Sequence, residues 1–69
     1  LNRWRQMKVG DLIKHHKSGR TALILGIHKL QIKGNSEAYV KLLFSRETFV
    51  SQAPLELVQD YWEVLSEAG

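Results

Sequence analysis

The strongest constraint on the fold is an apolar run at residues 21–28, Thr-Ala-Leu-Ile-Leu-Gly-Ile-His. Its side chains are apolar on both alternating faces, a pattern typical of a central β-strand rather than a half-exposed one. A helix is disfavoured because Gly26 interrupts the run and no capping box precedes it. Apolar and polar residues alternate from residue 29 to residue 32, so the strand can continue through them.

Shorter β-type segments lie on both sides of this run. Residues 37–45 place Ala38, Val40, Leu42 and Phe44 on one face of an extended chain, and residues 48–51 are β-branched and aromatic, so the two segments predict a hairpin. A first strand is predicted at residues 9–14, with Gly10-Asp11 as a turn or bulge inside it. A turn is predicted at residues 34–36.

The C-terminal segment admits two interpretations. Leu55, Val58 and Tyr61 recur at three-residue spacing, which predicts a 3₁₀ turn over residues 54–61 followed by a short strand at residues 62–65. The alternative is one α-helix over residues 54–67, favoured by proline at its first position and by good helix formers. We prefer the turn followed by the strand.

The chain is 69 residues long and contains no cysteine, so neither a disulfide nor a thiolate metal site can stabilise it. A domain of this size buries only about 60% of its unfolded surface, and self-association would add stability. We expect one domain at residues 7–65, a flexible N-terminal extension at 1–6 and a polar tail at 66–69. No apolar run approaches the length of a membrane-spanning helix, and the polar start is unlike a signal peptide.

Charge is uneven along the chain. Residues 1–36 hold eight Lys or Arg and one acid, and residues 37–69 hold two Lys or Arg and six acids, which gives +7 and −4 and sums to +3. The basic half contains a polar loop with a turn at Ser18-Gly19. Such a loop can contact phosphates, and its histidine can stack on a base. The candidate nucleic-acid-binding residues are Lys14, His16, Lys17 and Arg20, extended by Lys29 and Lys33 if the following hairpin folds toward them.

Tyr61 and Trp62 are the candidate protein-binding residues. Exposed aromatic side chains line the grooves of small barrels that bind proline-rich peptides. The simpler interpretation, which we favour, is that Trp62 closes one end of the core and packs on Leu12 and Val50. The acidic loop that accompanies such grooves in signalling domains is lacking here, since the loop at residues 14–20 is basic.

No catalytic or metal signature is present in the sequence. His15 and His16 are adjacent, so in an extended chain they point to opposite sides and cannot readily share one ion with His28. No serine or acid stands at a recognisable nucleophile spacing from a histidine, and no glycine-rich phosphate loop opens a helix. We therefore expect no enzyme activity, no metal and no cofactor.

Several motifs resemble small SH3-like barrels. Met-Lys-Val-Gly-Asp-Leu-Ile-Lys at residues 7–14 is similar to the opening of KOW-type barrels, although the lysine- and glycine-containing segment 29–36 departs from that pattern. Ala-Tyr-Val-Lys-Leu-Leu-Phe-Ser at 38–45 and Pro-Leu-Glu-Leu at 54–57 look like uncharacterised barrels of tailed bacteriophages, including phages of marine cyanobacteria. The resemblance covers residues 7–65 and implies an all-β, five-stranded SH3-like barrel with a short 3₁₀ turn before the last strand.

The resemblance transfers no catalytic residue, and barrels of this shape bind RNA, peptides, lipids or sibling subunits. We therefore expect a non-catalytic, phage-type binding or assembly module that acts through protein–protein contacts in the host cytoplasm or the virion. A protein partner or self-association is expected, with no membrane and no small-molecule substrate. The alternative is a nucleic-acid-binding barrel that uses the basic loop at residues 14–20.

Overall fold

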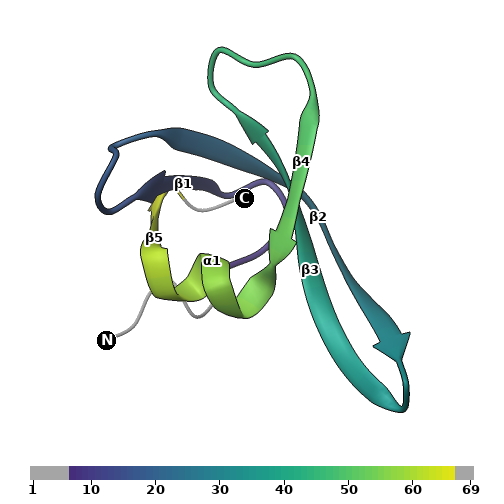
Figure 1. The fold of residues 1–69 in the computed structure, drawn as a ribbon. Helices are drawn as coiled ribbons and strands as arrows, with labels where there is room; N and C mark the ends of the chain where they lie inside the picture. Colours follow the sequence, from purple (N-terminus) through teal and green to yellow (C-terminus); the bar gives the residue numbers. More distant parts are fainter. Residues whose placement is uncertain (1–6, 67–69) are drawn as a thin grey trace.

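The computed structural model describes residues 7–66, so the predictions for residues 1–6 and for the end of the tail lie outside the described residues. The described residues form five strands and one helix (Figure 1). In chain order these elements are β1 (Leu12–His15), β2 (Thr21–Ile32), β3 (Asn35–Phe44), β4 (Val50–Pro54), α1 (Leu55–Tyr61) and β5 (Trp62–Ser66).

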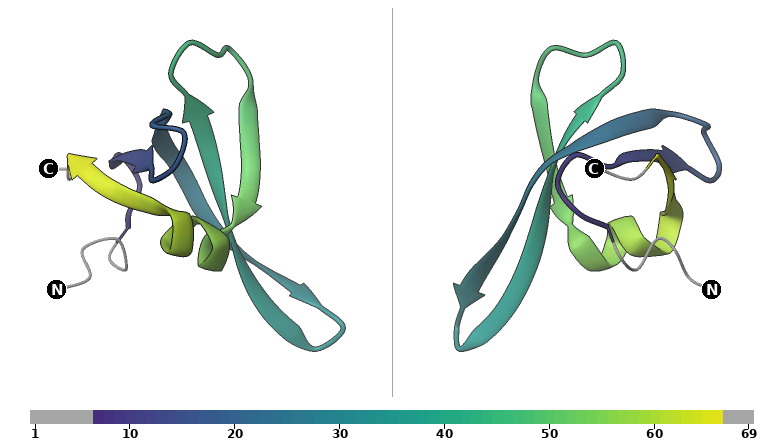
Figure 2. Two further views of the ribbon diagram at one scale, coloured as in Figure 1. Left: turned by 60° about the vertical axis from the view of Figure 1, so that its left-hand side comes forward. Right: turned by 180° about the vertical axis from the view of Figure 1, so that it is seen from behind.

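All five strands belong to one antiparallel sheet in the order β4-β3-β2-β1-β5. The long strand β2 is central, as predicted, because it pairs with β1 near its start and with β3 along most of its length. The sheet curls around its inner face, and α1 lies across the opening between β4 and β5 (Figures 1 and 2). The prediction of a small, barrel-like all-β domain is therefore confirmed.

The core is built from rows of side chains that face inward from neighbouring strands. Residues paired across a sheet point to the same face, so each row crosses several strands. Burial confirms this arrangement, since the side chains of Ile13, Ile24 and Val40 are fully inaccessible. The inner rows are Val64–Ile13–Ala22–Phe44, Ile24–Leu42–Ser51 and Ile27–Val40–Ala53.

A β-bulge at Leu25 determines which side chains of the run at 21–28 enter the core after Ile24. The register between β2 and β3 shifts between Ile24 and Gly26, so Leu25 has no direct partner on β3. Ile24 and Ile27 both pack in the core, although they are three residues apart. Leu23 and Leu25 are exposed. A bulge thus changes the inward period from two to three at one position.

The segment before the last strand is an α-helix rather than the predicted 3₁₀ turn. Pro54 caps its first turn in an extended conformation, Glu56 places a negative charge near the helix N-terminus, and Val58 is the helix residue that is fully buried. A helix of seven residues is too short to be stable alone, so the burial of Val58 holds it. The helix ends where predicted, because Trp62 is extended and begins the expected final strand.

The chain enters β1 through a turn at residues 8–11. The Asp11 N–H donates to the Lys8 carbonyl (3.1 Å), and the Lys8 N–H donates to Oδ2 of the buried Asp11 carboxyl group (3.0 Å). Gly10 has φ of 96°, and its N–H donates to the Ile24 carbonyl at 2.8 Å. The predicted turn is present, but it precedes β1, which begins at Leu12, rather than lying inside a strand over residues 9–14. It ties the chain to β2 before β1 begins.

We expect Gly10→Ala to destabilise the fold by about 1–2 kcal/mol, because a side chain at positive φ is strained. Gly26→Ala is the matched control. A Cβ atom at Gly26 would meet the Lys41 side chain at an ordinary 3.9 Å, so this change should cost less than Gly10→Ala. Urea unfolding of both variants measures the difference, and equal losses of stability would contradict the prediction.

Candidate functional site

A groove of about 640 Å³ opens at the end of the barrel where the β1–β2 loop faces the β3–β4 loop. Its walls come from four strands and both loops, so residues distant in sequence meet there. Aromatic and aliphatic side chains form the walls, and a few polar groups lie among them. The lining residues are His15, Ser18, Arg20, Leu42, Phe44, Glu47, Phe49, Ser51, Gln52, Ala53 and Trp62.

Trp62 forms one wall of this groove and also closes the core. Its ring packs edge-on against Phe44 (centroids 5.5 Å apart, 68° between planes) and against His15 (5.1 Å, 82°). These are the geometries that aromatic pairs prefer. Only 8% of Trp62 is exposed, so the favoured structural interpretation holds, but its neighbours are Phe44 and His15 rather than the predicted Leu12 and Val50.

Phe49 also lines the groove and is 60% exposed, the most exposed of the large apolar side chains in the described part of the chain. It lies between Thr48 and the start of β4, where the backbone leaves the sheet. The candidate protein-binding residues predicted from the sequence, Tyr61 and Trp62, did not include Phe49, because nothing in the sequence shows that it lines a groove with Trp62. Tyr61 lies elsewhere, with its ring stacked on His15 at 6.4 Å.

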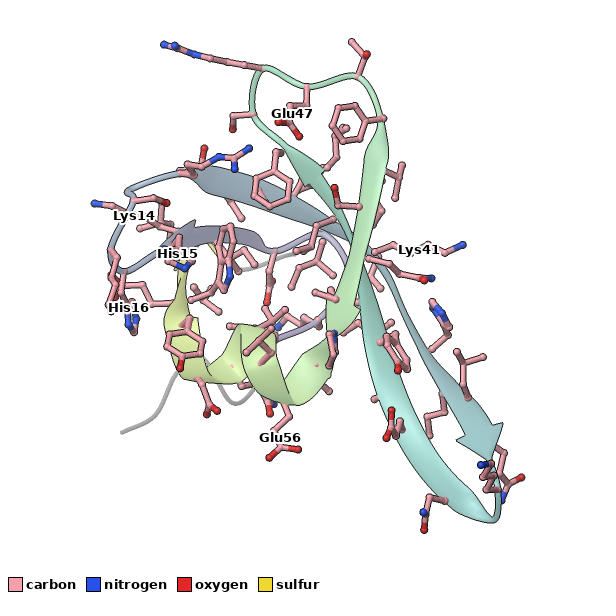
Figure 3. The ribbon with its side chains drawn as sticks, in the orientation of Figure 1. Lys14, His15, His16, Lys41, Glu47 and Glu56 are labelled. Carbon is pink, nitrogen blue, oxygen red and sulfur yellow. The ribbon has the colours of Figure 1, made fainter. Side chains whose placement is uncertain are left out.

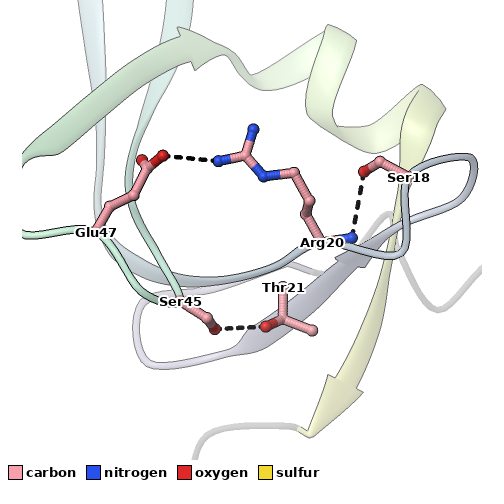
Figure 4. Close-up of polar contacts among 5 residues, drawn as sticks. All are labelled: Ser18, Arg20, Thr21, Ser45 and Glu47. Carbon is pink, nitrogen blue, oxygen red and sulfur yellow. Dashed lines mark hydrogen bonds and ion pairs between the residues drawn. The ribbon is translucent and has the colours of Figure 1, made fainter.

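An ion pair connects the two loops beside the groove (Figure 4). Arg20 Nη2 donates to Glu47 Oε2 at 2.9 Å, and the guanidinium carbon lies 4.3 Å from the centre of the Phe44 ring. The hydroxyl groups of Thr21 and Ser45 are also hydrogen-bonded to each other, which joins the bases of the same loops. Arg20 is thus held in place by Glu47 and Phe44 together.

The basic loop between β1 and β2 is ordered by His15. Its Nδ1 accepts hydrogen bonds from the backbone N–H groups of Lys17 and Ser18, each at 3.2 Å. The Arg20 N–H donates to Ser18 Oγ at 3.2 Å, and the His16 N–H donates to the Tyr61 carbonyl at 2.9 Å. Because Nδ1 accepts, a neutral His15 carries its proton on Nε2.

The candidate nucleic-acid-binding residues do not form one patch. Lys14, His16 and Lys17 are exposed at the β1–β2 loop (Figure 3). Lys29 and Lys33 lie on the long β2–β3 hairpin, which extends away from that loop in every view (Figures 1 and 2). The condition under which Lys29 and Lys33 would extend the basic patch is therefore not met. Its turn is Lys33-Gly34, both at positive φ, one residue earlier than predicted.

The outer face of the sheet carries a row of aliphatic side chains. Leu12, Leu23, Leu43 and Val50 are successive partners across β1, β2, β3 and β4, so they share the face opposite the core. Leu23 and Val50 are exposed. The two-sided apolar pattern of the sequence thus produces both a core and an uncovered outer row.

The comparisons with known proteins give no relative: no protein family model, no curated protein and no solved structure matches this chain. Within residues 7–66, no group of three or more histidine, cysteine or acidic side chains is placed to hold a metal ion. The one helix of this part is too short to cross a membrane. The groove is lined by aromatic rings and by the Arg20–Glu47 ion pair.

We expect Trp62→Ala to destabilise the domain by about 3–5 kcal/mol, because it removes a large ring shared by the core and the groove. A domain of this size has little more stability than that, so the variant should be largely unfolded at room temperature. Tyr61→Ala is the control, and a surface change of this kind should alter stability by about 0.5 kcal/mol or less. Thermal unfolding followed by circular dichroism compares them, and a native-like melting temperature for Trp62→Ala would refute the structural role.

Proposed function

We propose that this protein is a non-catalytic binding module that recognises a protein partner through the aromatic groove. The observation that carries the proposal is an open groove that the exposed Phe49 ring lines together with the fixed Trp62 and Phe44 rings. Rigid aromatic side chains provide contact area at low cost in conformational entropy, and they dominate the energetics of protein interfaces.

The groove suits an extended, apolar peptide segment. Its wall at Trp62 is already packed, so little ordering is needed when a ligand binds. Ser51 lies among the lining residues, and its hydroxyl group can bond to a peptide backbone. The Gln52 side chain is instead hydrogen-bonded to His28 at 3.1 Å. A proline-rich segment is one ligand of this kind, since it is extended before it binds.

The uncovered aliphatic row supports the same class of function. On most proteins, exposed aliphatic side chains occur singly. Here the exposed Leu23 and Val50 belong to a row of aliphatic side chains that crosses four strands. Self-association through this row is compatible with binding at the groove, because Val50 and Leu23 do not line it. An origin in a tailed bacteriophage and a place in the host cytoplasm or the virion stay predictions, which the neighbouring genes can test.

Nucleic-acid binding is the second candidate, and one observation favours it. The exposed Phe49 shares its groove with Arg20, and exposed rings beside cations are typical of proteins that bind single strands. We prefer the protein partner because Glu47 neutralises Arg20 and because Lys29 and Lys33 lie far from the groove. If the alternative is correct, a single-stranded oligonucleotide binds in a salt-dependent manner, and Lys14→Glu with Lys17→Glu abolishes binding.

A peptide display library selected against the folded domain tests the proposal. We expect selected peptides to bind the groove, and Phe49→Ala to weaken their binding about tenfold or more, because it removes an exposed ring at the centre of the contact. Leu57→Ala is the control, since Leu57 is equally apolar and exposed but lies on α1 outside the groove. Calorimetric titration measures both. Selected peptides that bind Phe49→Ala as tightly as the unchanged protein would overturn the groove as the site.

A further inference from the structure

The β2–β3 hairpin extends past both strands that flank it, and this leaves part of β3 without a second neighbour. β4 pairs with β3 only as far as the Tyr39–Pro54 pair. β2 continues to pair with β3 through the Ile32–Asn35 pair. Within the described residues, therefore, positions 35–38 of β3 have a strand on one side and none on the other. Unpaired strand edges are templates for an added strand.

A groove of about 540 Å³ follows this unpaired edge. Ser36 and Ala38 of β3 form one wall, and their small side chains leave the backbone accessible. The start of α1 forms the other wall, where Pro54 and Leu55 turn away from β3. A segment placed here would lie in line with β4, directly beyond the point where β4 stops pairing. A strand edge facing a helix is a geometry that accepts an extended peptide by β-strand addition.

The side chains around this groove are acidic. Glu37 and Glu56 line it, one from each wall, and none of its described lining residues is basic. Glu56 is exposed on the outer side of α1 (Figure 3). Glu37 Oε2 accepts a hydrogen bond from the Tyr39 hydroxyl at 2.9 Å, which fixes the carboxylate beside the strand edge. This bond and the charge of Glu37 raise the pKa of the Tyr39 phenol above 10.0, so the phenol keeps its proton and donates at neutral pH.

We infer that the groove between β3 and α1 binds an extended segment of a protein partner that carries lysine or arginine side chains, as an added antiparallel strand. Main-chain hydrogen bonds to residues 35–38 supply the affinity, and attraction to Glu37 and Glu56 supplies the preference for a basic segment. This site shares no lining residue with the aromatic groove, so a test of one site does not decide whether the other binds a ligand.

The charges favour this edge of the hairpin over the opposite one. The free edge of β2 bears Lys29, and Lys33 lies at the hairpin turn. Lysine side chains on an edge strand discourage pairing, and they would repel a basic segment. Helix α1 packs beside β3 and β4, so it provides a second wall only on the β3 side.

A fluorescent seven-residue peptide of alternating lysine and valine is the probe for this site. We expect it to bind the intact protein in an anisotropy titration, and in NMR spectra to shift the backbone amide signals of Ser36, Ala38 and Leu55. The same peptide with glutamate in place of lysine should not bind. Absence of binding by the lysine peptide, or equal binding by the glutamate peptide, would overturn the inference.

Three charge reversals with the same change in net charge separate the site from general attraction. Glu37→Lys and Glu56→Lys should each weaken binding of the lysine peptide about fivefold to tenfold, as expected when attraction becomes repulsion near the surface. Glu63→Lys is the matched control, because Glu63 is exposed on β5 and pairs across the sheet with Lys14. An equal effect of all three substitutions would show that the peptide responds only to net charge.

A peptide methylated on alternate backbone nitrogens tests for the added strand itself. It keeps every side chain and charge but cannot donate the hydrogen bonds that pair it with β3. When the methylated nitrogens are those that face β3, we expect no binding detectable by anisotropy. When the intervening nitrogens, which face away from β3, are methylated instead, we expect only a slight loss of binding. Equal binding by both methylated peptides would rule out strand addition, whatever the charge variants show.

Discussion

The β-bulge at Leu25 is the feature on which the rest of the fold depends. The central strand has to supply core side chains to two differently oriented parts of the sheet, one containing β1 and β5 and the other containing β3 and β4. A strand of unbroken alternation would turn Gly26 inward after Ile24, and glycine cannot fill a core. The bulge turns Ile27 inward instead, and a bulge also increases the local twist that lets a sheet curl. Leu23 lies outside for a different reason: it precedes the bulge and alternates with the inward-facing Ala22 and Ile24, so the outer row follows from ordinary alternation.

A few residues at the two ends of the curled sheet close it around the core. Val58 anchors a helix that is too short to persist alone, and Trp62 follows directly after it to pack against Phe44 and His15. The turn at residues 8–11 performs the corresponding task at the start of the sheet through Asp11 and Gly10. A chain without cysteine relies on such local devices because its core is small.

Much of the fold was predictable because alternation is a local property. The strands, their number and the central position of residues 21–32 follow from side-chain period, and the turn at Gly10 follows from residue type. The α-helical form of residues 55–61 did not follow, because three-residue spacing fits both helix types until Val58 has a core to enter. The Lys33-Gly34 turn was missed because lysine rarely adopts positive φ.

The candidate sites were less predictable than the fold, because both depend on pairs that are distant in sequence. Arg20 and Glu47 are 27 residues apart, and only the β2–β3 register brings their loops together. The sequence placed Arg20 in a basic loop, and it could not show that Glu47 neutralises it. Likewise, the partnerless stretch of β3 exists because β4 stops pairing at Pro54, which is a property of strand length rather than of residue type.

The long β2–β3 hairpin has a consequence for how the chain can vary. The core rows end with the Ile27–Val40 pair, and the Lys29–Ala38 pair further along the hairpin is not part of the core. Residues can therefore be added or removed in opposite pairs near Lys33-Gly34 without disturbing the register of any inner row. Homologous chains could carry β2–β3 hairpins of different length on the same barrel. The length of the hairpin can then evolve separately from the stability of the domain.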